Sequence, residues 1–309
     1  SISGNSATNH YAILIMPGTY VENVVVPDFV DLIGQSRTGT VIEDADLNTS
    51  GNGPIVVTMG AGSLISNLTV RVIAAGGGVH LQGDGASMTN CNVDVVAPDY
   101  YGGIDTWGVS ASNNNLVENV KIVGDDSLNG IKTGIHVYST DNRKMVVRNI
   151  SVQGAFRQGM AVGTPDTPES FLELSDVRIL TDGYSFGIRV SSGHVKLQNV
   201  SVDSRVPAGG CGYLYLVALW ADPGTTVRVV SSLIGNGDAC AFSSNAIRTW
   251  GNMWVDNSVL KGSIVSSGGT VLVGNSQVAS GAVAPEPPGQ TKTIGCYDGA
   301  YEPIPNGFH

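Results

Sequence analysis

The sequence predicts an all-β protein, a single right-handed parallel β-helix of about 9 to 11 coils with an extended C-terminal tail. Three observations predict it: the composition, one short pattern that recurs along the chain, and a second pattern that alternates with the first. Of the 309 residues only 14% are charged and 6% are aromatic, whereas 41 are glycine. This composition suits many short strands joined by tight turns.

The first pattern is an apolar residue, any residue, an Asn or small polar residue, two residues, and a second apolar residue. Its strong copies centre on Asn67, Asn90, Asn119, Asn149, Asp176 and Asn199, which are 23 to 30 residues apart. Weaker copies occur at 230–232, 255–257 and 273–275. An Asn at a turn tolerates left-handed backbone geometry and can bond to its equivalent in the next coil. We therefore expect Asn67, Asn149 and Asn199 to form a ladder, although each lies in a glycosylation sequon.

The second pattern is Gly, apolar, any residue, apolar. It occurs at 78–81, 108–111, 134–137, 159–162 and 187–190, with degenerate relatives at 218–221 and 246–249. Strands this short cannot bury an apolar face alone, but stacked coils with rungs about 4.8 Å apart can.

The coils are expected to occupy residues 1–281. The Pro-rich segment 282–292 should end the ladder, because proline cannot donate to it, so 282–309 is predicted to be a linker and a C-terminal tail. An open end of a β-helix is a free strand edge. A capping tail, a homo-oligomer or end-to-end assembly through the chain ends would each protect it.

Residues 13–42 carry a P-G-x-Y-x-E turn followed by L-I-G-x(5)-T-x-I. This segment resembles the opening coils of pectin methylesterases and of secreted bacterial β-helix proteins of the pectin-lyase-like superfamily. Residues 295–303 are similar to a closing motif of bacterial right-handed β-helix repeat proteins of unassigned activity. The resemblance implies the fold and a secreted or cell-surface location.

The catalytic strings of the esterases, Gln-Asp-Thr-Leu, Asp-Phe-Ile-Phe and Gly-Arg-Pro-Trp, are absent, and residues 104–107 preserve only an Asp-Thr pair. Residues 124–126, 134–136 and 187–189 are similar to polygalacturonases in the order of an Asp pair, a His and a basic residue. A catalytic Asp pair should lie on or beside the strand that faces the substrate, whereas these two aspartates precede that strand by about a turn.

The charge limits the partners of the chain. A formal net charge of −10 without a basic run argues against nucleic acid, and no apolar stretch is long enough for membrane insertion. A polysaccharide remains the expected partner. No cofactor is required, but Ca²⁺ could bridge the chain to a highly acidic glycan.

The four cysteines show no metal-ligand spacing. Cys211 and Cys240 are about one coil apart, so they are candidates for a disulfide between neighbouring coils.

In the second pattern the third position must point away from the core, so consecutive coils place these residues in one outward row. The row is predicted to contain His80, Ser110, His136, Ala161, Arg189, Trp220 and Arg248. With flanking residues it gives the candidate substrate-binding set Trp107, Tyr138, Arg157, Tyr184, Trp220, Arg248 and Trp250. Aromatic faces stack on sugar rings, and cations pair with hydroxyls or carboxylates.

The candidate catalytic set is His136, Arg189 and Asp105. His136 with Asp105 or Asp141 could supply a base and its orienting group, and Arg189 or Arg157 could bind a carboxylate. Three interpretations stay open. The chain is an extracellular polysaccharide binder (an adhesin, fibre or recognition module), a lyase, hydrolase or esterase acting on a pectin-like polymer, or a purely structural surface or filament protein.

Overall fold

The computed structural model describes residues 4–44, 54–73, 76–96, 106–112, 114–125, 132–138, 145–164, 171–181, 186–205, 216–237, 244–278, 283–285, 289–298, 300 and 307–308. By internal contacts the chain forms two compact units, residues 1–156 and 157–309. Within the described part, strands are the only regular elements. None of it is a helix long and apolar enough to span a membrane.

Each coil of both units places strands on up to three faces. The first face carries the Gly-apolar pattern. In unit 1 it consists of β3 (Val24–Val26), β6 (Ile55–Met59), β9 (Gly77–Leu81), β12 (Thr106–Ser112) and β14 (Lys132–Tyr138). In unit 2 it consists of β16 (Gln158–Gly163), β18 (Phe186–Ser192), β21 (Leu216–Ala221), β24 (Ser244–Thr249), β27 (Ser263–Ser266) and β30 (Val283–Pro285).

The second face precedes the Asn turn and the third face follows it. The second face comprises β1 (Tyr11–Ile15), β4 (Val30–Gly34), β7 (Leu64–Ser66) and β10 (Ser87–Thr89) in unit 1, and β19 (His194–Gln198), β22 (Thr226–Val230), β25 (Asn252–Asp256), β28 (Thr270–Gly274) and β31 (Gln290–Ile294) in unit 2. The third face comprises β2 (Gly18–Val21), β5 (Thr40–Glu43), β8 (Thr69–Val72) and β11 (Asn92–Val95) in unit 1, and β20 (Ser201–Arg205), β23 (Leu233–Gly237), β26 (Val259–Lys261), β29 (Gln277–Val278) and β32 (Tyr297–Asp298) in unit 2. Three strands run through both faces: β13 (Leu116–Gly124), β15 (Val146–Gly154) and β17 (Phe171–Thr181).

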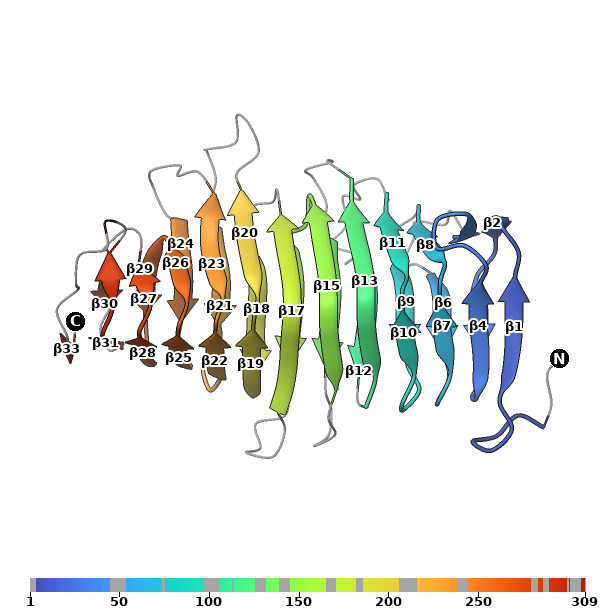
Figure 1. The fold of residues 1–309 in the computed structure, drawn as a ribbon, viewed down its shortest axis with the longest axis horizontal. Coiled ribbons are helices and arrows are strands. Elements are labelled where there is room, and N and C mark those ends of the chain that lie inside the picture. The colour runs from blue at the N-terminus through green and yellow to red at the C-terminus, as the bar shows by residue number, and fades with distance from the viewer. Residues whose placement is uncertain are drawn as a thin grey trace. The chain divides into compact units, whose positions relative to one another are not determined.

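Within each unit these strands pair in parallel with the strand one coil away, as β4, β7, β10 and β13 do in unit 1 (Figure 1). Parallel strands that wind through successive coils make a parallel β-helix, so the predicted fold is confirmed.

Stacked rows of apolar side chains fill the interior. On the third face of unit 1, Val70, Val93, Ile122 and Val152 are neighbours in register, and each is 0% exposed. Burying one such side chain contributes about 2 kcal/mol relative to leaving it in water. The repeated apolar pattern is therefore the main driving force for stacking the coils.

The Asn turn forms the predicted ladder. Asn90 donates to the Oδ1 atom of Asn67 at 3.0 Å, Asn119 donates to Asn90 at 3.0 Å, and Asn149 donates to Asn119 at 3.3 Å. The repeat residues with positive φ, between 47° and 56°, are Asn67, Asn90, Asn119, Asn149, Asp176, Asn199, Ser231, Asn257 and Asn275. The ladder prediction is confirmed, because this geometry suits Asn and leaves its amide free to bond along the stack.

The residue after this turn points into the core, and two cysteines occupy that position. Cys91 follows Asn90 and Cys296 follows Gly295, and both are buried, free thiols. Burial raises the pKa of Cys91 to about 11, so it remains a thiol and serves as a small apolar core residue. The predicted disulfide partners Cys211 and Cys240 lie outside the described residues.

The stacking continues beyond residue 281, where the sequence predicted its end. Strands β30, β31 and β32 pair in parallel with β27, β28 and β29. The ladder accommodates Pro285 because it is the last residue of β30, on which no further described strand stacks. Strand β33 (Gly307–Phe308) then pairs antiparallel with β31 at Lys292 and Thr293, which covers part of that edge.

Candidate functional site

The predicted outward row exists on the first face of unit 1. Thr58, His80, Ser110 and His136 are neighbours in register on β6, β9, β12 and β14. His80, Ser110 and His136 occupy the third position of the Gly-apolar pattern, and Thr58, which the pattern did not include, aligns with them. The apolar residues on either side of each are buried. The alternation of a pleated strand therefore aligns these polar side chains along the stack, as the sequence predicted.

Two aromatic side chains pack against the histidines of this row. The Trp107 ring lies over Gly77, where a Cβ would be only 2.3 Å from it, and meets His80 edge to face at 5.9 Å between centroids. His136 packs edge to face on Tyr138 at 5.0 Å, and Tyr138 is 42% exposed. Burial lowers the pKa of His80, which favours its neutral form.

The corresponding row of unit 2 carries a compact cluster of aromatic residues. Arg189, Trp220 and Arg248 are neighbours in register on β18, β21 and β24. Trp220 meets Phe186 edge to face at 4.8 Å and the tilted ring of Trp250 at 4.7 Å. All five side chains are partly exposed, so the cluster has an accessible surface. We call Phe186, Arg189, Trp220, Asp222, Arg248 and Trp250 the first-face cluster.

The polar groups of the first-face cluster are held in fixed positions. The guanidinium carbon of Arg248 is 5.6 Å from the Trp220 ring and 5.1 Å from the Trp250 ring. Arg189 donates from Nε and Nη2 to Asp222 Oδ2 at 3.1 and 2.9 Å. Trp220 donates from Nε1 to Asp222 Oδ1 at 2.6 Å. One carboxylate therefore orients both the arginine and the indole.

The remaining predicted site residues have other positions. Ala161 is in register with Arg189 but only 4% exposed, so it offers no functional group to the surface. Arg157 is exposed immediately before β16. His136 belongs to unit 1 and Arg189 to unit 2. Asp105 and Tyr184 lie outside the described residues.

Sequence reasoning missed Asp222, although a signal was present. Asp222 follows Trp220 by two residues, the spacing that puts both side chains on the same side of a strand.

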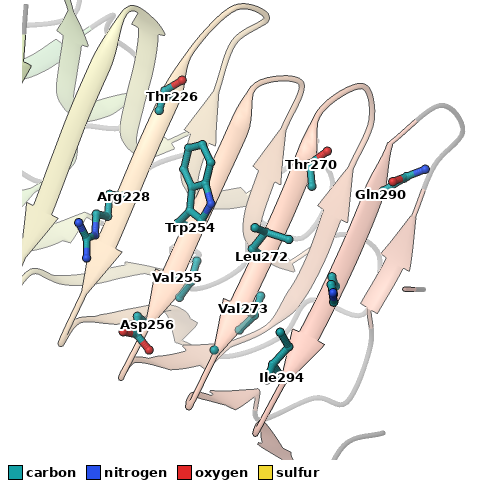
Figure 2. A pocket seen from close by; sticks show the side chains of 12 residues that line it. Thr226, Arg228, Trp254, Val255, Asp256, Thr270, Leu272, Val273, Gln290 and Ile294 are labelled. Atoms are coloured by element: carbon teal, nitrogen blue, oxygen red, sulfur yellow. The ribbon is translucent and has the colours of Figure 1, made fainter. Parts of the chain in front are cut away.

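It also missed a hollow of about 840 Å³ on the second face of unit 2. Figure 2 shows Arg228, Trp254 and Leu272 on neighbouring strands there, with Asp256 and Ile294 nearby. The outward residues of this face follow no repeated motif, so the sequence does not predict the hollow.

Among the described residues, no group of three or more His, Cys, Asp or Glu side chains is arranged to hold a metal ion. The only carboxylate of the first-face cluster is Asp222, which already bonds Arg189 and Trp220.

No protein-family profile matches this sequence, and no curated protein matches it. Among solved structures, the chain is similar to the A-module of the mannuronan C-5 epimerase AlgE6 from Azotobacter vinelandii, with a TM-score of 0.54 and 14% sequence identity. The match covers 97% of this chain and 92% of that module. At this identity the likeness shows the parallel β-helix fold alone.

Proposed function

We propose that this chain is a secreted or cell-surface β-helix protein that binds a polysaccharide along its first face. The single observation that carries the proposal is the first-face cluster, in which partly exposed Trp220 and Trp250 lie 4.7 Å apart beside Arg248. A similar fold in a module named for acting on mannuronan supports a polysaccharide as the ligand.

The cluster has the chemistry that sugar recognition needs. Indole faces stack on the apolar face of a pyranose ring, and guanidinium groups donate to hydroxyl or carboxylate oxygens. Asp222 holds the Trp220 indole in place before any ligand arrives. Such preorganisation lowers the entropy that binding would otherwise cost.

The alternative function is cleavage of a pectin-like polymer, for which His136 is the candidate base. Its packing against Tyr138 favours a defined ring orientation on the outer face. Glycoside hydrolysis needs two carboxylates and elimination needs a base with a cation. Among the described residues, the first-face cluster supplies one carboxylate, already bonded to two neighbours. Binding is therefore the better supported function.

The test is affinity electrophoresis through gels that contain pectic, alginate, xylan or bacterial exopolysaccharide chains. We expect retardation by at least one polymer and a loss of roughly tenfold or more in affinity for Trp220→Ala, because stacking on one aromatic ring contributes about 1 kcal/mol or more. Tyr297→Ala, which removes an exposed aromatic residue from the third face, is the matched control and should bind normally.

The same panel separates binding from catalysis. Unsaturated products, new reducing ends or released methanol that disappear in His136→Ala would establish the enzyme and replace the binding proposal. Equal retardation of the wild type, Trp220→Ala and the control would place glycan binding elsewhere on the chain.

A further inference from the structure

The hollow on the second face of unit 2 is built from two outward rows in register. One row contains Arg228, Trp254, Leu272 and Lys292, from β22, β25, β28 and β31. The other contains the polar residues Thr226, Asn252, Thr270 and Gln290 from the same strands. We call this surface the second-face groove.

The groove is hollow because strand β28 ends in Gly274, a residue without a side chain. Gly274 lies in register between Asp256 and Ile294, where a Cβ would come within 3.4 Å of the Asp256 carboxylate. Leu272 and the exposed Ile294 add apolar surface, and Trp254 rises beside them with 41% of its area exposed. In Figure 2 the Trp254 ring stands between Arg228 and Leu272.

The charge of the groove is opposite to that of the chain. Arg228 and Lys292 are both part of its lining, and Asp256 is the one acidic lining residue in the described part of the chain, whereas the whole chain carries a net charge of −10. Arg228 is exposed and, in the described part of the chain, forms no ion pair. An exposed guanidinium next to an exposed indole can therefore pair with an anionic group whose carbon skeleton stacks on the ring.

We propose that the second-face groove binds an anionic sugar unit of a polysaccharide, a uronate residue in a polymer chain. Trp254 stacks on the apolar face of the sugar ring, Arg228 pairs with the carboxylate, and the Thr226, Thr270 and Gln290 side chains bond hydroxyl groups. The volume of about 840 Å³ accommodates a few sugar units. The site is on a different face from the first-face cluster, so it does not depend on the function proposed for that cluster.

The test compares affinity electrophoresis in gels containing polygalacturonate with gels containing a neutral galactan. We expect retardation by polygalacturonate that weakens as salt is added, because the ion pair at Arg228 is exposed to solvent. Trp254→Ala and Arg228→Gln should each lower the affinity about tenfold or more. Trp254→Phe should retain much of it, which also shows that the loss in Trp254→Ala does not come from misfolding.

Arg148→Gln is the matched control for charge, because Arg148 is an outward arginine of the second-face half of β15 in unit 1. Equal losses in Arg148→Gln and Arg228→Gln would mean that the polymer responds only to overall charge, and would overturn the proposal. Equal retardation by the neutral galactan would overturn the anionic class.

Two further outcomes would also count against the groove. A loss in Trp220→Ala with none in Trp254→Ala would assign polygalacturonate binding to the first-face cluster alone. If Trp254→Ala changes the sedimentation of concentrated protein but not its mobility in the polygalacturonate gel, the groove is a contact between copies of the chain and not a glycan site.

Discussion

Two tryptophan sites in unit 2 differ in what surrounds the indole ring. On the first face, Trp220 packs on Phe186 and Trp250 and donates to Asp222. On the second face, Trp254 is 41% exposed beside the exposed Arg228. On the first face the Trp220 indole therefore packs and bonds within the protein, whereas on the second face Trp254 and Arg228 face solvent.

The difference shows how one repeat can carry two kinds of surface. The interior positions of every coil must be apolar, whereas the outward positions can vary more because they do not fill the core between the coils. Interlocked outward side chains give a rigid platform that contributes to stability and still presents partly exposed ring faces to a ligand. Exposed ones contribute little to stability and keep their interaction capacity for a ligand.

The largest expected contrast is in stability. Trp220→Ala should lower the free energy of unfolding by about 3 kcal/mol, because it removes packing against two rings and leaves one oxygen of Asp222 without its donor. Trp254→Ala should lower it by less than about 1 kcal/mol, because much of this side chain is already in water. Denaturant unfolding of both variants measures the difference. Equal losses would show that Trp254 is as tightly packed as Trp220, so the two sites would not differ in packing.

The sequence predicted the features that repeat. The fold, the Asn67 to Asn149 ladder and the outward row from Arg189 to Arg248 follow from strand alternation and turn geometry, which are local properties. Each coil restates the same pattern, so a weak copy is supported by its neighbours.

The features that depend on one coil's exact side chains were not predictable in the same way. The Asp222 contacts require the Arg189 and Trp220 rotamers, and the groove requires Gly274 to lie between two larger neighbours in register. Register between coils is set by stacking, and loops of variable length conceal it in the sequence. The continuation of the ladder past residue 281 was missed because an edge strand tolerates proline.

A smaller effect is expected when the first-face cluster is made more like the groove. Asp222→Asn keeps a side chain of the same shape near the Trp220 Nε1 but removes the ion pair with Arg189. Stability should fall by about 1 kcal/mol or less, because the arginine side chain is 40% exposed. Affinity for polygalacturonate should rise, because Arg189 becomes available to the ligand. Unchanged affinity would show that Arg189 has no part in binding anionic glycans.

The smallest expected effect concerns pH and the first face of unit 1. Burial lowers the pKa of His80, which lies between Thr58 and Ser110 in register and packs on Trp107. In the unfolded chain a histidine titrates near pH 6.5, so between that pH and the lowered value the unfolded state binds a proton that the folded state does not.

The contribution of His80 to stability is therefore fully present above about pH 6.5 and declines as the pH falls towards the lowered pKa. His80→Gln should remove this decline and flatten the pH dependence of unfolding, which denaturant titrations at several pH values can measure. Comparison of the two proteins at about pH 8, where the histidine is neutral in both states, isolates any change in packing on Trp107. If the two pH profiles have the same slope, His80 is as freely hydrated as a histidine in the unfolded chain. The His80 side chain would then be open to solvent, as Trp254 is, and not packed, as Trp220 is.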